Sequence, residues 1–224
     1  MVTMVTVVCI KAGPKYSHRY VNILHDAVRR HLSLPHRFVC ATDDTTGIRR
    51  DIETVPLGEP HLKGWWHKLQ LFKPSPPGPW GLSGRLLFLD LDVALVGEID
   101  SIVLYRPDLP LVLCRDFIYP NSMNNSSVML LTAGSRPEIW KQFSMTPDGW
   151  AKKFPGDQEF LYRFWPDIPT FPEKWIVSYK LSARQQLPMG SKIVAFHGKP
   201  KPSEIHVGWV PEIWVERQYE LKQL

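Results

Sequence analysis

The sequence predicts an α/β protein whose mostly parallel central sheet is flanked by helices, with residues 1–224 forming a single domain. Two observations lead to this prediction. Short apolar segments that resemble buried strands alternate with segments of helical period in the first half of the chain. Polar residues follow directly after several of these apolar segments, as they do at the carboxyl ends of parallel strands. A length of 224 residues suits one domain with a substantial core.

The predicted elements begin with a strand over residues 3–10, which is broken at Gly13 and Pro14. Ser17 is well placed to cap a helix, because the apolar residues after it recur along one helical face. Pro137 is typical of the first turn of another helix. Further strands are predicted at residues 37–41, 52–55, 85–89, 109–114, 127–131 and 192–196, and further helices at residues 65–72, 137–143 and 157–164.

The most informative segment is the strand at residues 85–89, which runs directly into Asp90 and Asp92. Its bulky residues predict a strand that is buried on both faces. Residues two apart in an extended chain point the same way, with Cα atoms about 6.6 Å apart. Carboxylates are rarely buried without a partner, because removing water from a charge is costly. The pattern therefore predicts a divalent cation with oxygen ligands, and the alternative is a chance Asp-x-Asp at a strand end.

Polar residues follow the first two strands as well, and their pattern has two interpretations. Asp43 and Asp44 come after the strand at residues 37–41, where an acid can bind a ribose hydroxyl or simply form a turn. Lys11, Gly13 and Lys15 follow the first strand and can cradle a phosphate or a base, although they lack a regular glycine spacing.

The last predicted strand leads into a basic turn that begins at His197. A histidine there can bind a metal, and Gly198 allows a phosphate to approach the backbone closely. Lys199 or Lys201 can neutralise phosphate charge. The same residues also fit an ordinary turn without a ligand.

Two further segments contain candidate sugar-binding groups. Asp157 and Gln158 open a predicted helix, where Asp is usually a cap but where the pair can also face a sugar. Trp65 and Trp66 precede Lys68 and form either a stacking surface beside a positive charge or part of the core.

Charge and composition limit the classes of partner. The net charge is +5, from 27 basic and 22 acidic residues, and the basic residues are scattered along the chain. They fit a solvated surface or attraction to a phosphorylated substrate, but not a nucleic-acid-binding protein. No apolar run approaches the roughly 18 residues of a transmembrane helix. Three cysteines within apolar segments argue for a reducing compartment, so we expect a cytoplasmic protein without disulfides.

Taken together, these segments resemble the nucleotide-sugar-dependent glycosyltransferases of the GT-A fold, and most of all family 8 with its bacterial and viral relatives. The resemblance extends from residue 1 to about residue 202, and it rests on the order and spacing of the motifs rather than on any one of them. The matching segments are residues 39–44, 64–69, 87–92, 125–129, 156–158 and 197–200.

The resemblance implies a GT-A (Rossmann-like) domain that transfers a hexose from a nucleoside-diphosphate sugar, with uridine diphosphate as the expected carrier, to a saccharide or protein-linked glycan with retention. It also implies that Asp90, Asp92 and His197 hold Mn²⁺ (or Mg²⁺) on the diphosphate. Asp157 and Gln158 are the implied catalytic residues. The implied nucleotide-sugar-binding residues are Lys11, Ala12, Asp43, Asp44, Lys68, Asp90, Leu91, Asn125, Gly198 and Lys199.

Two departures from the family pattern leave details open. The segment after His197 is shorter than usual, so the phosphate-binding lysine is either Lys199 or Lys201. The segment Asn125-Ser126-Ser127 has Ser where family 8 commonly has Gly.

Two other classes compete with this interpretation. A haloacid-dehalogenase-type phosphatase also begins an Asp-x-Asp after apolar residues and would use Asp90 as its nucleophile. That family expects Thr or Val two residues after the second Asp, where this chain has Ala94, and it places the motif near the N-terminus. A non-catalytic sugar-binding protein is the other alternative, and it would not need an Asp pair combined with a distant His and Lys.

Overall fold

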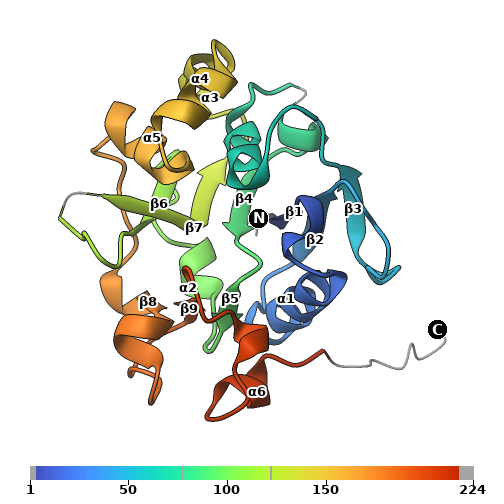
Figure 1. The fold of residues 1–224 in the computed structure, drawn as a ribbon, viewed down its shortest axis with the longest axis vertical. Coiled ribbons are helices and arrows are strands. Elements are labelled where there is room, and N and C mark those ends of the chain that lie inside the picture. The colour runs from blue at the N-terminus through green and yellow to red at the C-terminus, as the bar shows by residue number, and fades with distance from the viewer. Residues whose placement is uncertain (1–3, 77, 122, 217–224) are drawn as a thin grey trace.

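The computed structural model describes residues 4–76, 78–121 and 123–216, and its centre is a six-stranded sheet in the order β3-β2-β1-β4-β7-β6 (Figure 1). Strands β3, β2, β1 and β4 are parallel, whereas β7 runs antiparallel to both β4 and β6. The strands are β1 (Val5–Lys11), β2 (His36–Thr42), β3 (Glu53–Pro56), β4 (Arg85–Leu89), β6 (Leu111–Arg115) and β7 (Asn124–Thr132).

A second, smaller sheet contains three short strands in the order β5-β9-β8. Strand β5 (Val93–Leu95) pairs antiparallel with β9 (Ile193–Ala195), and β9 pairs parallel with β8 (Ile176–Ser178). This sheet lies at the bottom of the view in Figure 1, together with α6 (Val210–Ile213).

The helices cover both faces of the central sheet. Helix α1 (His18–His31) packs on one side, and α3, α4 and α5 gather at the top of Figure 1. The remaining helical segments are α2 (Asp100–Val103), α3 (Pro137–Ser144), α4 (Pro147–Lys153), α5 (Asp157–Phe164), the π-helix η5 (Tyr179–Ala183) and the 3₁₀ segments η1 (Gly13–Lys15), η2 (Gly64–Phe72), η3 (Pro79–Gly81), η4 (Glu173–Trp175) and η6 (Pro202–Glu204). No helix among the described residues has both the length and the apolar character needed to cross a bilayer.

Side chains along the central strands point alternately to the two faces of the sheet, and they form one core cluster on each face. On β4, Leu87 and Leu89 face the cluster that contains α1 and the second sheet. Leu86 and Phe88 face the opposite cluster, which contains η2, α3 and α5. Because both faces are buried, a nearly continuous apolar run forms this strand, as the sequence predicts.

Every predicted strand and helix is present, with differences at the ends. The predicted first strand begins at residue 3, which lies outside the described residues, and β1 is described from Val5. The helix predicted at residues 65–72 is a 3₁₀ segment, and β7 starts at Asn124, earlier than the predicted residue 127. Strands β5 and β8 are absent from the prediction, because three residues are too few to show a periodic pattern.

Helix α5 carries the predicted catalytic pair at its start and is anchored through Phe160. This ring is fully buried and contacts six aromatic residues. They are Trp66, Phe143, Trp150, Phe154, Phe164 and Trp165. The aromatic cluster therefore fixes α5 against η2 and α3.

Replacing this anchor should be costly. We expect Phe160→Ala to lower the free energy of unfolding by about 3–5 kcal/mol, because it removes a buried ring and leaves a cavity. Arg163→Ala, at an exposed position of the same helix, should change it by no more than about 0.5 kcal/mol. Urea denaturation followed by circular dichroism measures both values. Similar losses in the two variants would contradict the anchoring role of Phe160.

Candidate active site

Asp90 and Asp92 lie where the chain passes from the central sheet into the second sheet. The Asp90 N–H donates to the Ser127 carbonyl at 2.8 Å and so extends the pairing of β4 with β7. The Asp92 carbonyl accepts from the Phe196 N–H at 3.0 Å, which begins the pairing of β5 with β9. Leu91, between the acids, is buried in the core. Both acids are therefore held by backbone pairing on opposite sides of one buried residue.

The Asp90 carboxylate is paired with Lys68. The Lys68 Nζ donates to Asp90 Oδ2 at 2.9 Å and to Ser126 Oγ at 3.1 Å, and it lies 4.0 Å from Asp157 Oδ2. Burial raises the pKa of the Asp90 carboxyl to about 6, against the opposing effect of the Lys68 charge. Burial would lower the pKa of the Lys68 ammonium, but the charges of Asp157 and Asp90 raise it above its ordinary value. Lys68 therefore stays charged and joins η2, β4 and α5.

The Asp92 carboxylate has a different set of partners. The Tyr16 hydroxyl donates to Asp92 Oδ2 at 2.8 Å, and the Lys201 ammonium donates to the same oxygen. Burial, followed by the negative charge of Asp92, raises the pKa of the Tyr16 hydroxyl, so it remains a donor. Lys199 points elsewhere, because its side chain is 86% exposed and its nearest carboxylate is Glu204 at 3.8 Å. Of the two lysines that the sequence leaves open, Lys201 is therefore the one that reaches Asp92.

His197 lies beside this group but is bonded to another residue. Its Nε2 forms a 2.7 Å hydrogen bond with Ser178 Oγ, and its ring stacks on Phe117 with a centroid separation of 5.4 Å. Burial and the nearby charge of Lys180 lower the pKa of the imidazole, which keeps it neutral and able to bind a metal. Gly198 follows with a φ of +67°, a left-handed conformation that favours glycine.

Asp157 and Gln158 reach the same region from the start of α5. Gly156, which has no side chain that could cap the helix, occupies the N-cap position, and Asp157 is the first helical residue. Asp157 is only 3% exposed, and its Oδ2 has no hydrogen-bond partner among the described residues. Gln158 Oε1 accepts from Asn125 Nδ2 at 3.2 Å. Asp157 therefore does not occupy the cap position, and its carboxylate faces the Lys68 group.

The residues predicted to bind a nucleoside lie at the carboxyl ends of β1 and β2. Asp43 Oδ2 accepts from the Gly13 N–H at 2.9 Å. Asp44 accepts from the Thr46 N–H and from Lys11, and these contacts, the first above all, lower the pKa of Asp44 to about 2. Asp44 thus forms the turn and an ion pair, while Asp43 joins the two strand-end loops.

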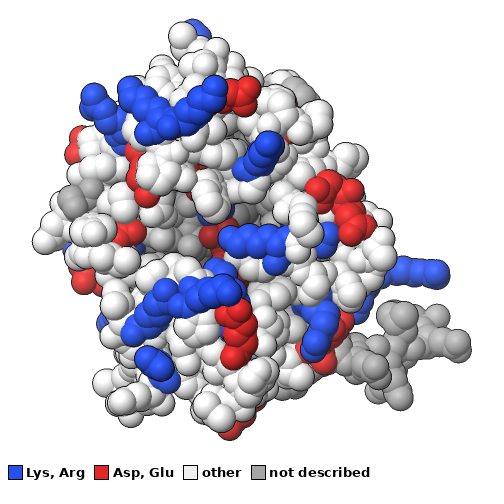
Figure 2. Space-filling model, viewed as in Figure 1, with Lys and Arg blue, Asp and Glu red and all other residues white. Residues whose placement is uncertain are grey.

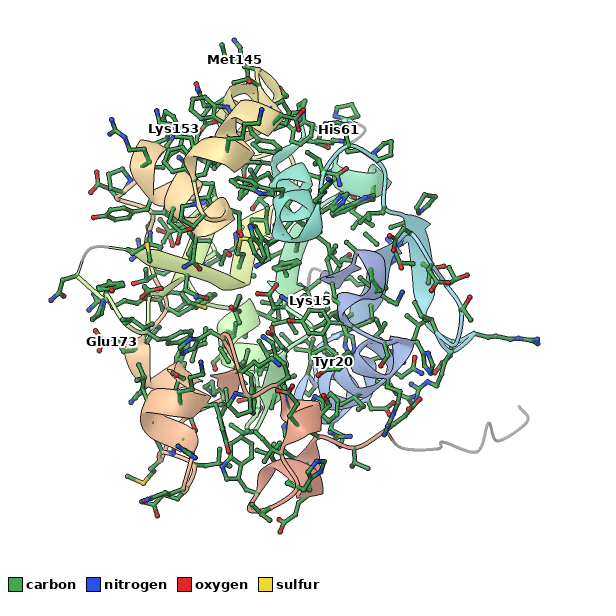
Figure 3. All side chains as sticks on the ribbon, viewed as in Figure 1. Lys15, Tyr20, His61, Met145, Lys153 and Glu173 are labelled. Atoms are coloured by element: carbon green, nitrogen blue, oxygen red, sulfur yellow. The ribbon has the colours of Figure 1, made fainter. Side chains whose placement is uncertain are left out.

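Three adjoining cavities connect these loops to the Asp pair. The first, of about 160 Å³, contains Asp90, Asp92 and Lys68 in its wall, and it shares Ala12 with the second, of about 440 Å³. The second shares Asp43 with the third, of about 430 Å³. In Figure 2, Lys and Arg side chains border a central hollow in which acidic atoms are visible. Lys15 and Tyr20, labelled in Figure 3, lie on the side formed by η1 and α1.

The adjacent tryptophans have separate roles. Trp66 is buried, and its ring stacks on Phe143 with a centroid separation of 5.6 Å, so the core interpretation holds for it. Trp65 is 46% exposed and forms part of the wall of the first cavity, with the Lys15 ammonium 5.6 Å from the centroid of its ring. The sequence singles out both residues. Only their different burial in the folded protein shows that Trp66 belongs to the core and that Trp65 is available for stacking.

The donor groups around the Asp pair fit a hard divalent cation in their chemistry. Two carboxylates and a neutral imidazole are suitable ligands for Mn²⁺ or Mg²⁺. Asp92 and the Phe196 carbonyl already converge on a positive charge, that of Lys201. Within residues 4–76, 78–121 and 123–216, however, no three His, Cys, Asp or Glu side chains are arranged as one metal-binding group. If Asp90, Asp92 and His197 were to share one cation, the side chains of Lys201 and His197 would therefore have to rearrange.

Comparison with known proteins gives information on the fold. No family model and no curated protein matches the sequence. Among solved structures, the glycosyltransferase GlyE of Streptococcus pneumoniae TIGR4 has a TM-score of 0.68 at 15% identity, covering 93% of this chain and 59% of that one. The fold is that of the GT-A glycosyltransferases. This chain thus spans less than two thirds of the GlyE chain.

The galactosyltransferase LgtC has the same fold over most of its length. Its structure with donor and acceptor sugar analogues has a TM-score of 0.61 at 14% identity, and 88% of each chain is covered. A second LgtC structure is that of an active-site variant in which a glutamine is replaced by glutamate. The bifunctional glycosyltransferase WbbM has a TM-score of 0.58 at 12% identity, covering 89% of this chain and 46% of that one.

The structure also adds two site residues that the sequence does not single out. Tyr16 contacts Asp92 and Ser178 contacts His197. Ser126, which the sequence marks only as a departure from the family pattern, contacts Lys68. Tyr16 directly follows the loop of Lys11, Gly13 and Lys15, which is the only sequence signal for it. Ser178 lies in β8, which has no periodic signal.

Removing the Lys68 ammonium, which lies between Asp90 and Asp157, should destabilise the protein. We expect Lys68→Met to lower the free energy of unfolding by about 3–5 kcal/mol, because Asp90 and Asp157 lose their common counter-charge. Adding Asp90→Asn should recover part of this loss, since an amide needs no counter-charge. Urea denaturation of both variants measures the difference. An equal loss in the single and double variants would contradict the electrostatic role of Lys68.

Proposed function

We propose that this chain is a metal-dependent glycosyltransferase that transfers a hexose from a nucleoside-diphosphate sugar, with uridine diphosphate as the carrier, to a saccharide or protein-linked glycan with retention. The observation that carries the proposal is the convergence of three carboxylates and two ammonium groups around the carboxyl end of β4. The carboxylates are Asp90, Asp92 and Asp157, and the ammonium groups are Lys68 and Lys201. Glycosyltransferases with the same fold support this interpretation.

The arrangement of the cavities suits the parts of such a donor. The nucleoside lies in the cavities beside Ala12 and Asp43, at the ends of β1 and β2. This matches the general rule that ligands of parallel α/β sheets bind outside the carboxyl ends of the strands. The diphosphate then lies near Asp92 and Lys201, and the sugar lies toward Lys68 and Asp157.

Asp90, Asp92 and His197 would hold the cation, with Mn²⁺ or Mg²⁺ as the expected ion. A cation there neutralises charge that develops on the departing diphosphate. Lys201 adds a second positive charge on the phosphate side. Lys68 offsets part of the negative charge of Asp90 and Asp157, because its ammonium is close to both.

Asp157 and Gln158 act on the sugar side of the bond that breaks. Positive charge develops on the sugar ring in the transition state, and a nearby carboxylate stabilises it. The Asp157 Oδ2 is buried and has no hydrogen-bond partner among the described side chains, which leaves it available for this role. Asn125 holds the Gln158 amide at the same place. LgtC, which has the same fold, also has an active-site glutamine.

The first test is metal dependence. We expect the protein to release nucleoside diphosphate from a panel of nucleotide sugars with Mn²⁺, and to lose this activity in chelator. Asp92→Asn should reduce turnover by at least about 100-fold, because a charge that stabilises the leaving group through the cation is lost. Chromatographic detection of the released nucleotide measures the rate, and the melting temperature serves as the control for folding. Full activity in chelator would refute the metal role.

The same panel distinguishes the competing classes. A glycosyltransferase releases nucleoside diphosphate, a haloacid-dehalogenase-type phosphatase that uses Asp90 as nucleophile releases inorganic phosphate, and a non-catalytic sugar-binding protein releases neither. Release of phosphate alone would therefore replace the proposed reaction with the phosphatase.

The second test separates the sugar side from the phosphate side. Asp157→Asn should lower the transfer rate by about 100-fold or more, because it removes a charge beside the developing cation. Its affinity for free nucleoside diphosphate, measured by calorimetry, should stay within about twofold, since that ligand lacks the sugar. An unchanged rate with an unchanged melting temperature would exclude Asp157 from catalysis.

A further inference from the structure

The ammonium of Lys201 lies in a site made of oxygen acceptors. It donates to Asp92 Oδ2 and to the Phe196 carbonyl, the latter at 2.9 Å, and the Tyr16 ring centroid is 5.8 Å away. The side chains of Lys201 and Asp92 are only 16% and 12% exposed. Hydrogen bonds to Asp92 and to the Phe196 carbonyl therefore hold the Lys201 ammonium in place, whereas Lys199 is exposed.

A divalent cation would use oxygens of the same kind. Carboxylate and carbonyl oxygens are the ligands that Mg²⁺ and Mn²⁺ prefer. Asp92 is the central member of the predicted metal site, and Lys201 already neutralises it. An ammonium and a metal ion cannot both bind Asp92 Oδ2 closely, because their charges repel each other.

We infer that Lys201 competes with the divalent cation for Asp92 and moves to the diphosphate when the cation arrives together with its nucleotide. This inference rests on the proposed function and adds the order in which the site is filled. The cation alone must displace Lys201 without offering it a new partner, so it binds weakly. A cation that brings a diphosphate offers such a partner, so metal and nucleotide bind with positive coupling, and each raises the affinity for the other equally.

The surrounding structure allows Lys201 to leave Asp92 by rotation of its own side chain. The Lys201 backbone is fixed, because its N–H donates to Glu204 Oε2 at 2.7 Å at the start of η6. Asp92 keeps a partner after Lys201 leaves, because the Tyr16 hydroxyl still donates to it. The Tyr16 ring is in turn supported by Tyr20, with a centroid separation of 4.8 Å. The flexible stem of lysine makes it better suited to such a move than a rigid group.

The decisive experiment measures binding of Mn²⁺ in the absence of nucleotide. Free Mn²⁺ is followed by electron paramagnetic resonance in titrations of the full chain and of Lys201→Met. We expect the affinity for Mn²⁺ alone to rise about tenfold in the variant, because a charge-assisted hydrogen bond no longer competes. We expect the affinity for uridine diphosphate with saturating Mn²⁺ to fall about tenfold, because the diphosphate loses its ammonium partner. Opposite changes from one substitution are the signature of the exchange.

Lys199→Met provides a matched control. It removes the same charge from the same loop, but its ammonium lies beside Glu204 and not beside Asp92. The affinity for Mn²⁺ alone should stay within about twofold of the unmodified protein, since only screened long-range charge is lost. Lys201→Arg, which keeps the positive charge, should also bind Mn²⁺ weakly. An equal rise in the Lys199 and Lys201 variants would show a general charge effect and overturn the inference.

The unmodified protein gives a test that needs no variant. Titration of Mn²⁺ at increasing concentrations of uridine diphosphate should show its affinity rising, and this coupling should be smaller in Lys201→Met. An unchanged or lower affinity of Lys201→Met for Mn²⁺ alone would overturn the exchange, even if turnover remains metal-dependent. The absence of Mn²⁺ binding in every variant would refute the proposed metal role as well.

Discussion

Two carboxylates at the end of a buried strand need positive charge close by, and the arrangement of the site follows from this requirement. Strand β4 carries Asp90 and Asp92 to a place where water screens them poorly. Lys68 approaches Asp90 from η2, and Lys201 approaches Asp92 from the loop after β9. Each acid has its own ammonium. Segments that are far apart in the sequence are therefore held together at the carboxyl end of β4.

The junction between the two sheets determines which groups can meet. The chain leaves the central sheet at Asp90 and enters the second sheet at Asp92. The pairing of Val93 with Ala195 then fixes the position of the segment that contains His197 and Lys201. A shift of this register by one residue would turn every side chain of β9 to the other face. The small second sheet therefore positions His197 and Lys201, on the side of the site that we propose binds the diphosphate.

The side of the site that we propose binds the sugar is organised by α5 in a different way. Its aromatic residues bury the helix against η2, which leaves Asp157, the first residue of the helix, 4.0 Å from the Lys68 ammonium. Lys68 thus serves both sides, since it bonds Asp90 and lies near Asp157. A single buried ammonium links the group that would bind the metal to the group that would act on the sugar. Such shared counter-charges make the site sensitive to substitution at any one member.

The sequence by itself determines the central strands, the helices around them and the Asp pair, because long apolar runs and helical periods depend only on local pattern. It also places Asp43, Asp157 and His197 after their strands or at their helix start. It does not separate Lys199 from Lys201, or Trp65 from Trp66, since adjacent positions in a turn have no periodicity. Only the tertiary structure decides these cases, because the pairing of β5 with β9 and the packing of the aromatic cluster involve residues far apart in the chain. For the same physical reason, the contacts of Tyr16 with Asp92 and of Ser178 with His197 become apparent only in the folded protein.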